Sequence, residues 1–158
     1  DTTPYERLSE QDPEMAERQV AMGFNGPASH ATFIFRSEAE VRRSWLAAAL
    51  PEQEVETLIS GTDFSRQVLV AFSFGMRMNA SGKIQISELR YNESHPGYTI
   101  AAHIGVVPES CGFSFAESYP FVVGVTTAVP DAEVRGYSSS NYPDKCGPIV
   151  SGEPTTQP

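Results

Sequence analysis

The stretch DFSRQVLVAFSFG, residues 63–75, begins with polar residues, continues as a run of β-forming residues and stops at a glycine. It predicts a core strand, because β-branched and aromatic side chains favour the pleated surface of a sheet. Side chains alternate between the two sides of a strand, and we expect apolar residues on both. One face would carry Val68, Val70 and Phe72, and the other Leu69, Ala71 and Ser73.

The residues after this strand predict further strands separated by turns. GMRMNASG (75–82) contains the turn formers of a hairpin connection, and KIQISELRY (83–91) alternates apolar and polar residues. That alternation is typical of an antiparallel strand with one face in water. The remaining strands are expected within YTIAAHIGVV (98–107), FSFAESYPFVVGVTT (113–127) and EVRGY (133–137).

The residues before it predict mainly helices. Asp12 followed by Pro13 is a typical helix start, and this first helix would end near Gly23. HATFIFR (30–36) then predicts a strand, whose Phe33 and Phe35 lie on the same side.

Two more helices are expected between residues 37 and 60. In SEAEVRRSWLAAAL (37–50), Ser37 and Glu40 have the spacing of a capping box. Trp45, the only tryptophan, would fix this helix to a sheet. PEQEVETLIS (51–60) begins with a proline and precedes Gly61, so it predicts a separate helix.

Helices early and antiparallel strands late predict an α+β fold, with N-terminal helices packed on an antiparallel β-sheet or a small β-sandwich. The 158 residues suit a single domain. We expect a flexible N-terminal segment over residues 1–12, one α+β domain over residues 13–147, and a flexible tail rich in Pro, Gly, Ser and Thr over residues 148–158.

The formal net charge of −9 argues against nucleic acid as a partner, because phosphate binding requires clustered Lys and Arg. It also disfavours docking on an anionic membrane surface. No apolar run approaches the roughly 20 residues that span a bilayer. An acidic surface is compatible both with simple solubility and with attraction of a basic partner.

Cys111 and Cys146 are the only cysteines, and an even number favours a disulfide. The alternative, two metal ligands, lacks further Cys or His at ligand spacing. The chain begins at Asp1, as it would after removal of a signal peptide, although a trimmed chain would look the same. We therefore expect an extracytoplasmic protein, either periplasmic or secreted, and a lipid anchor in the precursor stays open.

Candidate groups for catalysis are sparse. His30, His95 and His103 lack partners at metal spacing, so neither a metal nor another cofactor is expected. Glu88 and Glu93 lie near His95, but a polar surface turn explains that grouping better. Ser138, Ser139 and Ser140 precede Asp144 without the Gly-x-Ser-x-Gly pattern that exposes a nucleophile. The sequence therefore predicts no catalytic residue.

A more distinctive signal is the segment YSSSNYPDK (137–145), which we expect to form a loop next to the disulfide. Tyr surrounded by Ser and Asn is typical of rigid contact surfaces that also form hydrogen bonds. We predict a binding surface for a protein partner here, made by Tyr137, Ser139, Asn141, Tyr142 and Asp144.

The series DFSRQVLVAFSFG, KIQISELRY, YTIAAHIGVV and YPFVVGVTT, preceded by SEAEVRRSWLAAAL, resembles the PrcB-type C-terminal domain over about residues 33–128. That family is named for an accessory subunit of a bacterial surface protease complex. Its loop usually carries two glycines, whereas NASGK (79–83) has one. The resemblance implies an extracytoplasmic, non-enzymatic domain that binds a protein.

Three functional hypotheses follow, in order of preference. The first is a periplasmic or secreted binding module that stabilises or restrains a partner enzyme, such as a hydrolase or protease. The second is a periplasmic inhibitor or immunity protein directed against a toxin or a lysozyme-like hydrolase. The third is a small serine hydrolase that uses a serine of residues 138–140.

Overall fold

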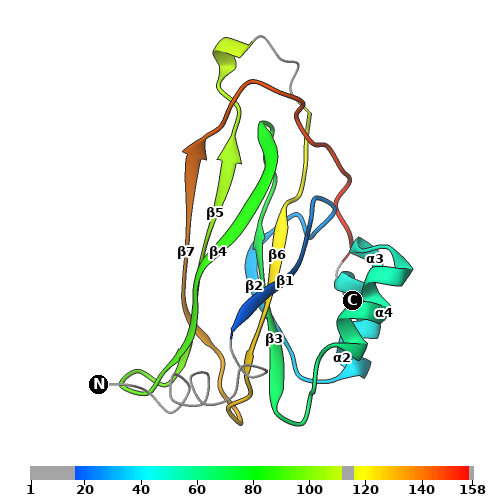
Figure 1. Ribbon diagram of the computed structural model, residues 1–158, viewed down its shortest axis with the longest axis vertical. Coiled ribbons are helices and arrows are strands. Elements are labelled where there is room, and N and C mark those ends of the chain that lie inside the picture. The colour runs from blue at the N-terminus through cyan, green and yellow to red at the C-terminus, as the bar shows by residue number, and fades with distance from the viewer. Residues whose placement is uncertain (1–16, 112–115, 157–158) are drawn as a thin grey trace.

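The computed structural model describes residues 17–111 and 116–156, and it contains two β-sheets packed face to face with three helices on one side (Figure 1). The first sheet has the order β1 (Arg18–Gly23), β6 (Phe121–Thr127), β3 (Gln67–Phe74) and β2 (His30–Phe35). The second sheet has the order β4 (Ala80–Asn92), β5 (Gly97–Val106) and β7 (Val134–Pro143). The helices are α2 (Glu38–Arg42), α3 (Trp45–Ala49) and α4 (Glu52–Ser60). The predicted α+β class, with helices against a small sandwich, is confirmed.

Strand β3 lies inside the first sheet and is buried along its whole length. Leu69 and Ala71 pack against the helices, whereas Val68, Val70 and Phe72 pack against the second sheet. The predicted alternation is therefore confirmed. A strand covered on both faces must be apolar on both faces, which is why residues 67–74 form an almost continuous hydrophobic run.

The helical layer is held to the first sheet by Trp45, as expected. Its ring makes edge contacts with Phe33, Phe35 and Phe121, at centroid distances of 5.2, 6.1 and 5.1 Å. The helix expected over residues 37–50 is divided in two. Ser44 accepts a hydrogen bond from the Leu46 N–H (3.1 Å) and thereby begins α3. Serine is a good N-cap and a poor interior residue, which explains the break.

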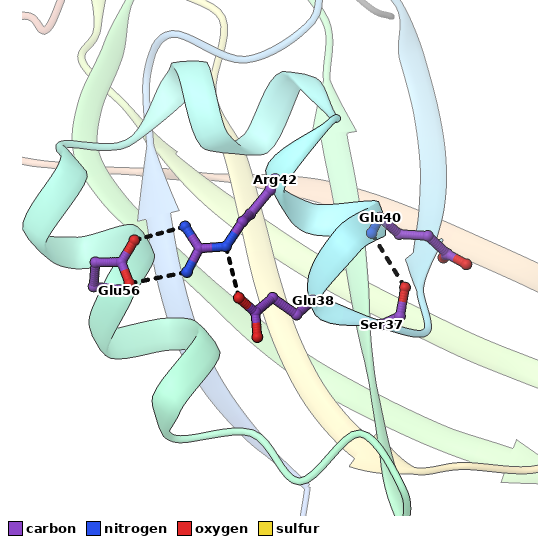
Figure 2. A network of polar contacts seen from close by, with 5 residues as sticks. All are labelled: Ser37, Glu38, Glu40, Arg42 and Glu56. Atoms are coloured by element: carbon purple, nitrogen blue, oxygen red, sulfur yellow. Dashed lines mark hydrogen bonds and ion pairs between the residues drawn. The ribbon is translucent and has the colours of Figure 1, made fainter.

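The start of α2 confirms Ser37 as its N-cap, since its hydroxyl accepts a hydrogen bond from the Glu40 N–H (Figure 2). The Glu40 carboxylate accepts from the N–H of Arg36, one residue earlier than the expected capping box. Figure 2 also shows Arg42 between Glu38 and Glu56, with contacts of 2.8 and 2.7 Å. This arginine joins α2 to α4 and lowers the pKa of the Glu56 carboxyl.

The first expected helix is wrong over its described part. Residues 18–23 form β1, which pairs antiparallel with β6, and the predicted start at Asp12 lies outside the described residues, as does the segment 1–12. The apolar spacing of Val20 and Met22 fits a strand as well as a helix. Pairing with the edge of β6 decides between them, because short-range propensity is weak against a ladder of hydrogen bonds.

The expected hairpin between residues 63–75 and 83–91 is also wrong. β3 and β4 belong to different sheets, and residues 75–79 carry the chain across the sandwich. Gly75 begins this crossing with a φ of +76°, a conformation that favours glycine. The next connection, over residues 93–96, does form a hairpin and joins β4 to β5.

The second sheet differs from the all-antiparallel expectation because β5 and β7 are parallel neighbours. The C-terminal ends of β5 and β7 therefore lie next to each other, at the same end of the sheet. Just beyond those ends, Cys111 of the short 3-10 helix Glu109–Cys111 is joined to Cys146, so the predicted disulfide is confirmed.

One margin of the sandwich is bridged by a side chain, and we call it the bridged edge. The amide of Gln19 in β1 donates to the carbonyl of Ile84 (3.2 Å) and accepts from the N–H of Ile86 (2.8 Å) in β4. Inside this margin, Gly124 faces β4, where an added Cβ would lie only 2.5 Å from Leu89 and 2.8 Å from Ile86. The two sheets are therefore in close contact where β1 and β6 meet β4.

The C-terminal segment leaves the end of β7 and passes to the side of the first sheet (Figure 1). Its backbone N–H groups at Val150, Gly152 and Thr155 donate to carbonyls of Ala80, Glu117 and Gly26, at 3.1, 3.0 and 3.0 Å. Composition predicts a flexible tail here, yet these three hydrogen bonds attach residues 150–155 to β4 and to the loops that contain Glu117 and Gly26.

Candidate functional site

The segment expected to be a contact loop is a strand. Residues 137–143 belong to β7, which pairs with β5 on one side and forms the margin of the second sheet. Strand pairing overrides the loop-like composition of YSSSNYP, because β5 offers a regular row of hydrogen-bonding groups. The predicted binding residues are therefore presented by a sheet edge.

The alternation of β7 divides the predicted residues between two faces. Tyr137, Ser139 and Asn141 are register partners of Ile100, Ala102 and Ile104, whose side chains are buried in the core between the sheets. Neighbouring residues of paired strands face the same side. These three residues therefore face the margin between the sheets. Tyr142 faces the opposite, outer side, and its ring contacts the ring of His103 at 5.2 Å.

Tyr137 is the central residue of this margin. Its ring lies 5.5 Å from the ring of His30 in β2 and 5.9 Å from that of Phe72 in β3. Phe72 in turn contacts Phe74 at 4.8 Å. Tyr137 is nevertheless 50% exposed, one of the few large hydrophobic side chains on the described surface. It is an aromatic anchor that packs on the buried ring of Phe72 and the exposed ring of His30 and is still open to a partner.

The cluster continues into the crossing segment through Arg77. Its guanidinium lies 5.7 Å from the centre of the Phe74 ring and donates to the Asn141 Oδ1 at 3.0 Å. Partial burial lowers the pKa of Arg77. Met76 and Met78 on either side are 45% and 37% exposed. We call Met76, Arg77, Met78, Tyr137 and Asn141 the edge patch.

A cleft of about 530 Å³ lies near the start of β7, between that strand and β2. Thr32, Ile34 and Val134 supply part of its wall. The Arg36 guanidinium donates hydrogen bonds to the backbone carbonyls of Ala132 and Val129. These bonds turn the guanidinium towards the backbone. Asp131 and Glu133 lie on the exposed rim. The cleft and the edge patch together form the margin that we call the open edge.

The outer face of the second sheet holds the other predicted residues. Asp144 accepts from the Lys83 ammonium at 3.2 Å. The Ser81 hydroxyl, the Lys145 N–H and Lys83 together hold the pKa of Asp144 below its ordinary value. These contacts fasten the residue after β7 to β4. Asp144 is thus separated from Tyr137 by the thickness of the sheet.

The candidates for catalysis do not converge. His103 is the register partner of Ser140, but its Nε2 contacts the Gln85 side chain at 3.3 Å. Glu88 pairs with Arg90 at 2.6 Å, away from the turn that contains His95. Within residues 17–111 and 116–156, no group of three His, Cys, Asp or Glu side chains is placed to hold a metal ion.

Sequence reasoning identified Tyr137 and Asn141 but missed their neighbours. His30, Phe72, Phe74 and Arg77 come from segments far away along the chain, and strand pairing brings them together. The alternation Met76-Arg77-Met78 was an available signal, because two large apolar residues in a polar turn need a partner surface.

The chain matches no known protein family, no curated protein and no solved structure. Of the helices within the described residues, none has the length and apolar character needed to cross a bilayer. The resemblance to the PrcB-type domain therefore stays a prediction, and the function has to be argued from the open edge itself.

Proposed function

We propose that this protein is an extracytoplasmic, non-enzymatic domain that binds a partner protein through the edge patch and stabilises or restrains it. The partner is an enzyme, most simply a hydrolase or a protease. Binding occurs through surface contact, in which the partner covers the exposed ring of Tyr137 and the side chains of Met76 and Met78.

The observation that carries this proposal is the position of Tyr137. A half-exposed tyrosine packed on His30 and Phe72 loses little conformational freedom on binding, because its ring is already oriented. Tyrosine and arginine are enriched among residues that dominate binding energy, and Arg77 is linked to this strand through Asn141. Met76 and Met78 add adaptable apolar area.

The disulfide supports the proposed compartment. Cys111–Cys146 is the kind of bond that persists in the periplasm or outside the cell and is rare in a reducing cytoplasm. It lies just beyond β7, where it helps to fix the strand that presents Tyr137. An accessory subunit of a surface enzyme and a secreted inhibitor both fit this location.

The proposal is tested with a matched pair of tyrosine variants. Full-length chain carrying a cross-linker is used to capture its partner from a native envelope extract, and the purified partner is then titrated by calorimetry. Tyr137→Ala is expected to weaken binding by roughly tenfold or more, as for a central aromatic anchor. Tyr142→Ala, on the outer face, is expected to change it by less than about threefold. Equal losses would contradict docking at the open edge, and absence of a specific partner would contradict the function.

Activity of the captured enzyme distinguishes the two forms of the function. If the chain raises the thermal midpoint of its partner without lowering turnover, it is an accessory subunit. If turnover falls in proportion to occupancy, it is an inhibitor or immunity protein. Hydrolysis of ester, peptide or glycan substrates that disappears in a variant with Ser138, Ser139 and Ser140 all changed to Ala would instead favour the serine hydrolase.

A further inference from the structure

We propose that the free side of β7 receives an extended, basic segment of the partner protein as an additional β-strand. This inference rests on the proposed binding function and specifies its geometry. The second sheet would grow from three strands to four, in the order β4, β5, β7 and the partner segment.

The first argument is the unused backbone of β7. The strand pairs with β5 from Gly136 to Pro143 without interruption, and no strand within the described residues lies on its other side. Backbone N–H and C=O groups of successive residues alternate between the two sides of a strand. Half of those groups in β7 therefore point outward in a regular row, which an extended backbone can complete.

The second argument is that the middle of β7 lacks the usual protection of an edge strand. Natural edges carry charged side chains, prolines or bulges that prevent unwanted pairing. In β7 these features lie only at the two ends: a register shift and Arg135 before Gly136, and Pro143 as the last residue. From Gly136 to Tyr142 there is no charged residue, no proline and no register shift. Three consecutive serines occupy the middle, small enough for another backbone to approach. An unprotected stretch from Gly136 to Tyr142 in a native edge strand is well explained by a function in pairing.

The third argument concerns the charge of the occupant. A second copy would bring together two chains that each carry a net charge of −9. Asp131 and Glu133 are exposed just before β7. The nearby Arg36 guanidinium is directed at two backbone carbonyls, and Arg135 in β7 donates to the Pro96 carbonyl at 3.1 Å. A lysine or arginine of the added segment would face these carboxylates. Charge complementarity thus selects a basic segment of another protein.

The cleft supplies side-chain specificity. An added strand beside β7 would point every second side chain towards the margin of β2. The cleft of about 530 Å³ has walls from Thr32, Ile34 and Val134 and is large enough for a branched apolar side chain. Tyr137 lies further along the same side of β7. The preferred segment therefore alternates apolar residues, which face inward, with polar or basic residues.

The probe is a ten-residue peptide of alternating valine and lysine, added to isotope-labelled full-length chain and followed by amide hydrogen exchange. We expect alternate amides of residues 136–142 to exchange at least tenfold more slowly with the peptide, because only the outward N–H groups gain partners. Protection confined to β1, β2 or β4, or absence of peptide binding, would overturn strand addition at β7.

N-methylated peptides separate strand pairing from simple charge attraction. One peptide is methylated on every valine and another on every lysine, which blocks opposite backbone sides. We expect one of them to lose binding and the other to keep it, because an added strand pairs along one side only. Equal binding of both, or loss of both, would contradict the proposal.

Charge selection is tested by a double variant, Asp131→Asn with Glu133→Gln. We expect it to bind the valine–lysine peptide roughly fivefold more weakly, in the range known for exposed charge pairs. The matched control, Glu52→Gln with Glu54→Gln, removes the same charge from α4 and should bind normally. Equal weakening by both would overturn recognition at the rim. If strand addition fails while Tyr137→Ala still weakens the natural partner, the proposed function stands and only this inference falls.

Discussion

The bridged edge and the open edge are the two margins of one sandwich. The two sheets are closely packed at the bridged edge and separated by a cleft at the open edge. At the bridged edge, the Gln19 amide occupies backbone groups of β4, and Gly124 lets β4 pack closely against the first sheet. At the open edge, β2 and β7 leave a cleft, and Tyr137 is half exposed. Because the same two sheets close one margin, the opening at the other is a specific property of β2 and β7.

The largest effect is expected from removing the disulfide that fixes the end of β7. Replacing Cys111 and Cys146 together by serine should lower the free energy of unfolding by about 4 kcal/mol, since the bond closes a long loop in the unfolded chain. Denaturant unfolding at equilibrium measures this loss. Amide exchange should accelerate more in β7 than in β4, and a uniform acceleration would contradict a special dependence of the open edge on the disulfide.

A pair of glycine variants compares packing at the two margins directly. Gly124→Ala places a methyl group against Leu89 and Ile86, and we expect a loss of about 1–3 kcal/mol in unfolding free energy. Among the described residues, a methyl group at Gly136→Ala in β7 meets only Thr99, at 3.6 Å or beyond, and this variant should change stability by less than about 0.5 kcal/mol. Thermal or denaturant unfolding checks both. Similar losses would mean that the margins are equally packed.

The smallest effect concerns pH and the attachment of Asp144 behind β7. Its folded pKa is lowered, chiefly by the Ser81 hydroxyl, so this contribution is fully present above the ordinary value of 3.8. It is lost as the pH falls below 3.8 through the lowered folded pKa. Asp144→Asn should therefore reduce the thermal midpoint slightly at pH 6, and this difference should vanish once the pH falls below the lowered folded pKa.

The pH experiment needs a comparison between proteins, because Glu56 and Asp63 also have lowered pKa values. Both the natural chain and the Asp144→Asn variant lose those contributions in acid, and the difference between their midpoints isolates Asp144. A difference that persists unchanged at low pH would show that the asparagine acts through packing and not through charge.

The contrast between β3 and β1 shows what could be predicted. β3 was predicted with its two faces, because a strand with both sides buried leaves an unmistakable apolar run in the sequence. Residues 18–23 were assigned to a helix, because six residues of mixed polarity satisfy either periodicity. The greater length and complete burial of β3 made its secondary structure predictable, whereas the short and partly exposed β1 stayed ambiguous.

The candidate site was predictable only in part. Tyr137 and Asn141 stand out by composition, but their separation from Tyr142 and Asp144 depends on the alternation of β7. A loop has no such alternation, and the sequence YSSSNYP predicted a loop. His30 and Phe72 joined Tyr137 through pairings that connect residues more than 40 positions apart, which local patterns do not encode.

By itself, the sequence determined the core strand, the caps at Ser37 and Gly61, the role of Trp45 and the disulfide, because each depends on neighbouring residues or on a unique pair of side chains. Only the tertiary structure decided which strands became edges. That outcome depends on how β3 and β4 separate into two sheets and on the parallel alignment of β7 with β5. Both are long-range choices, made by burial of whole faces rather than by any single segment.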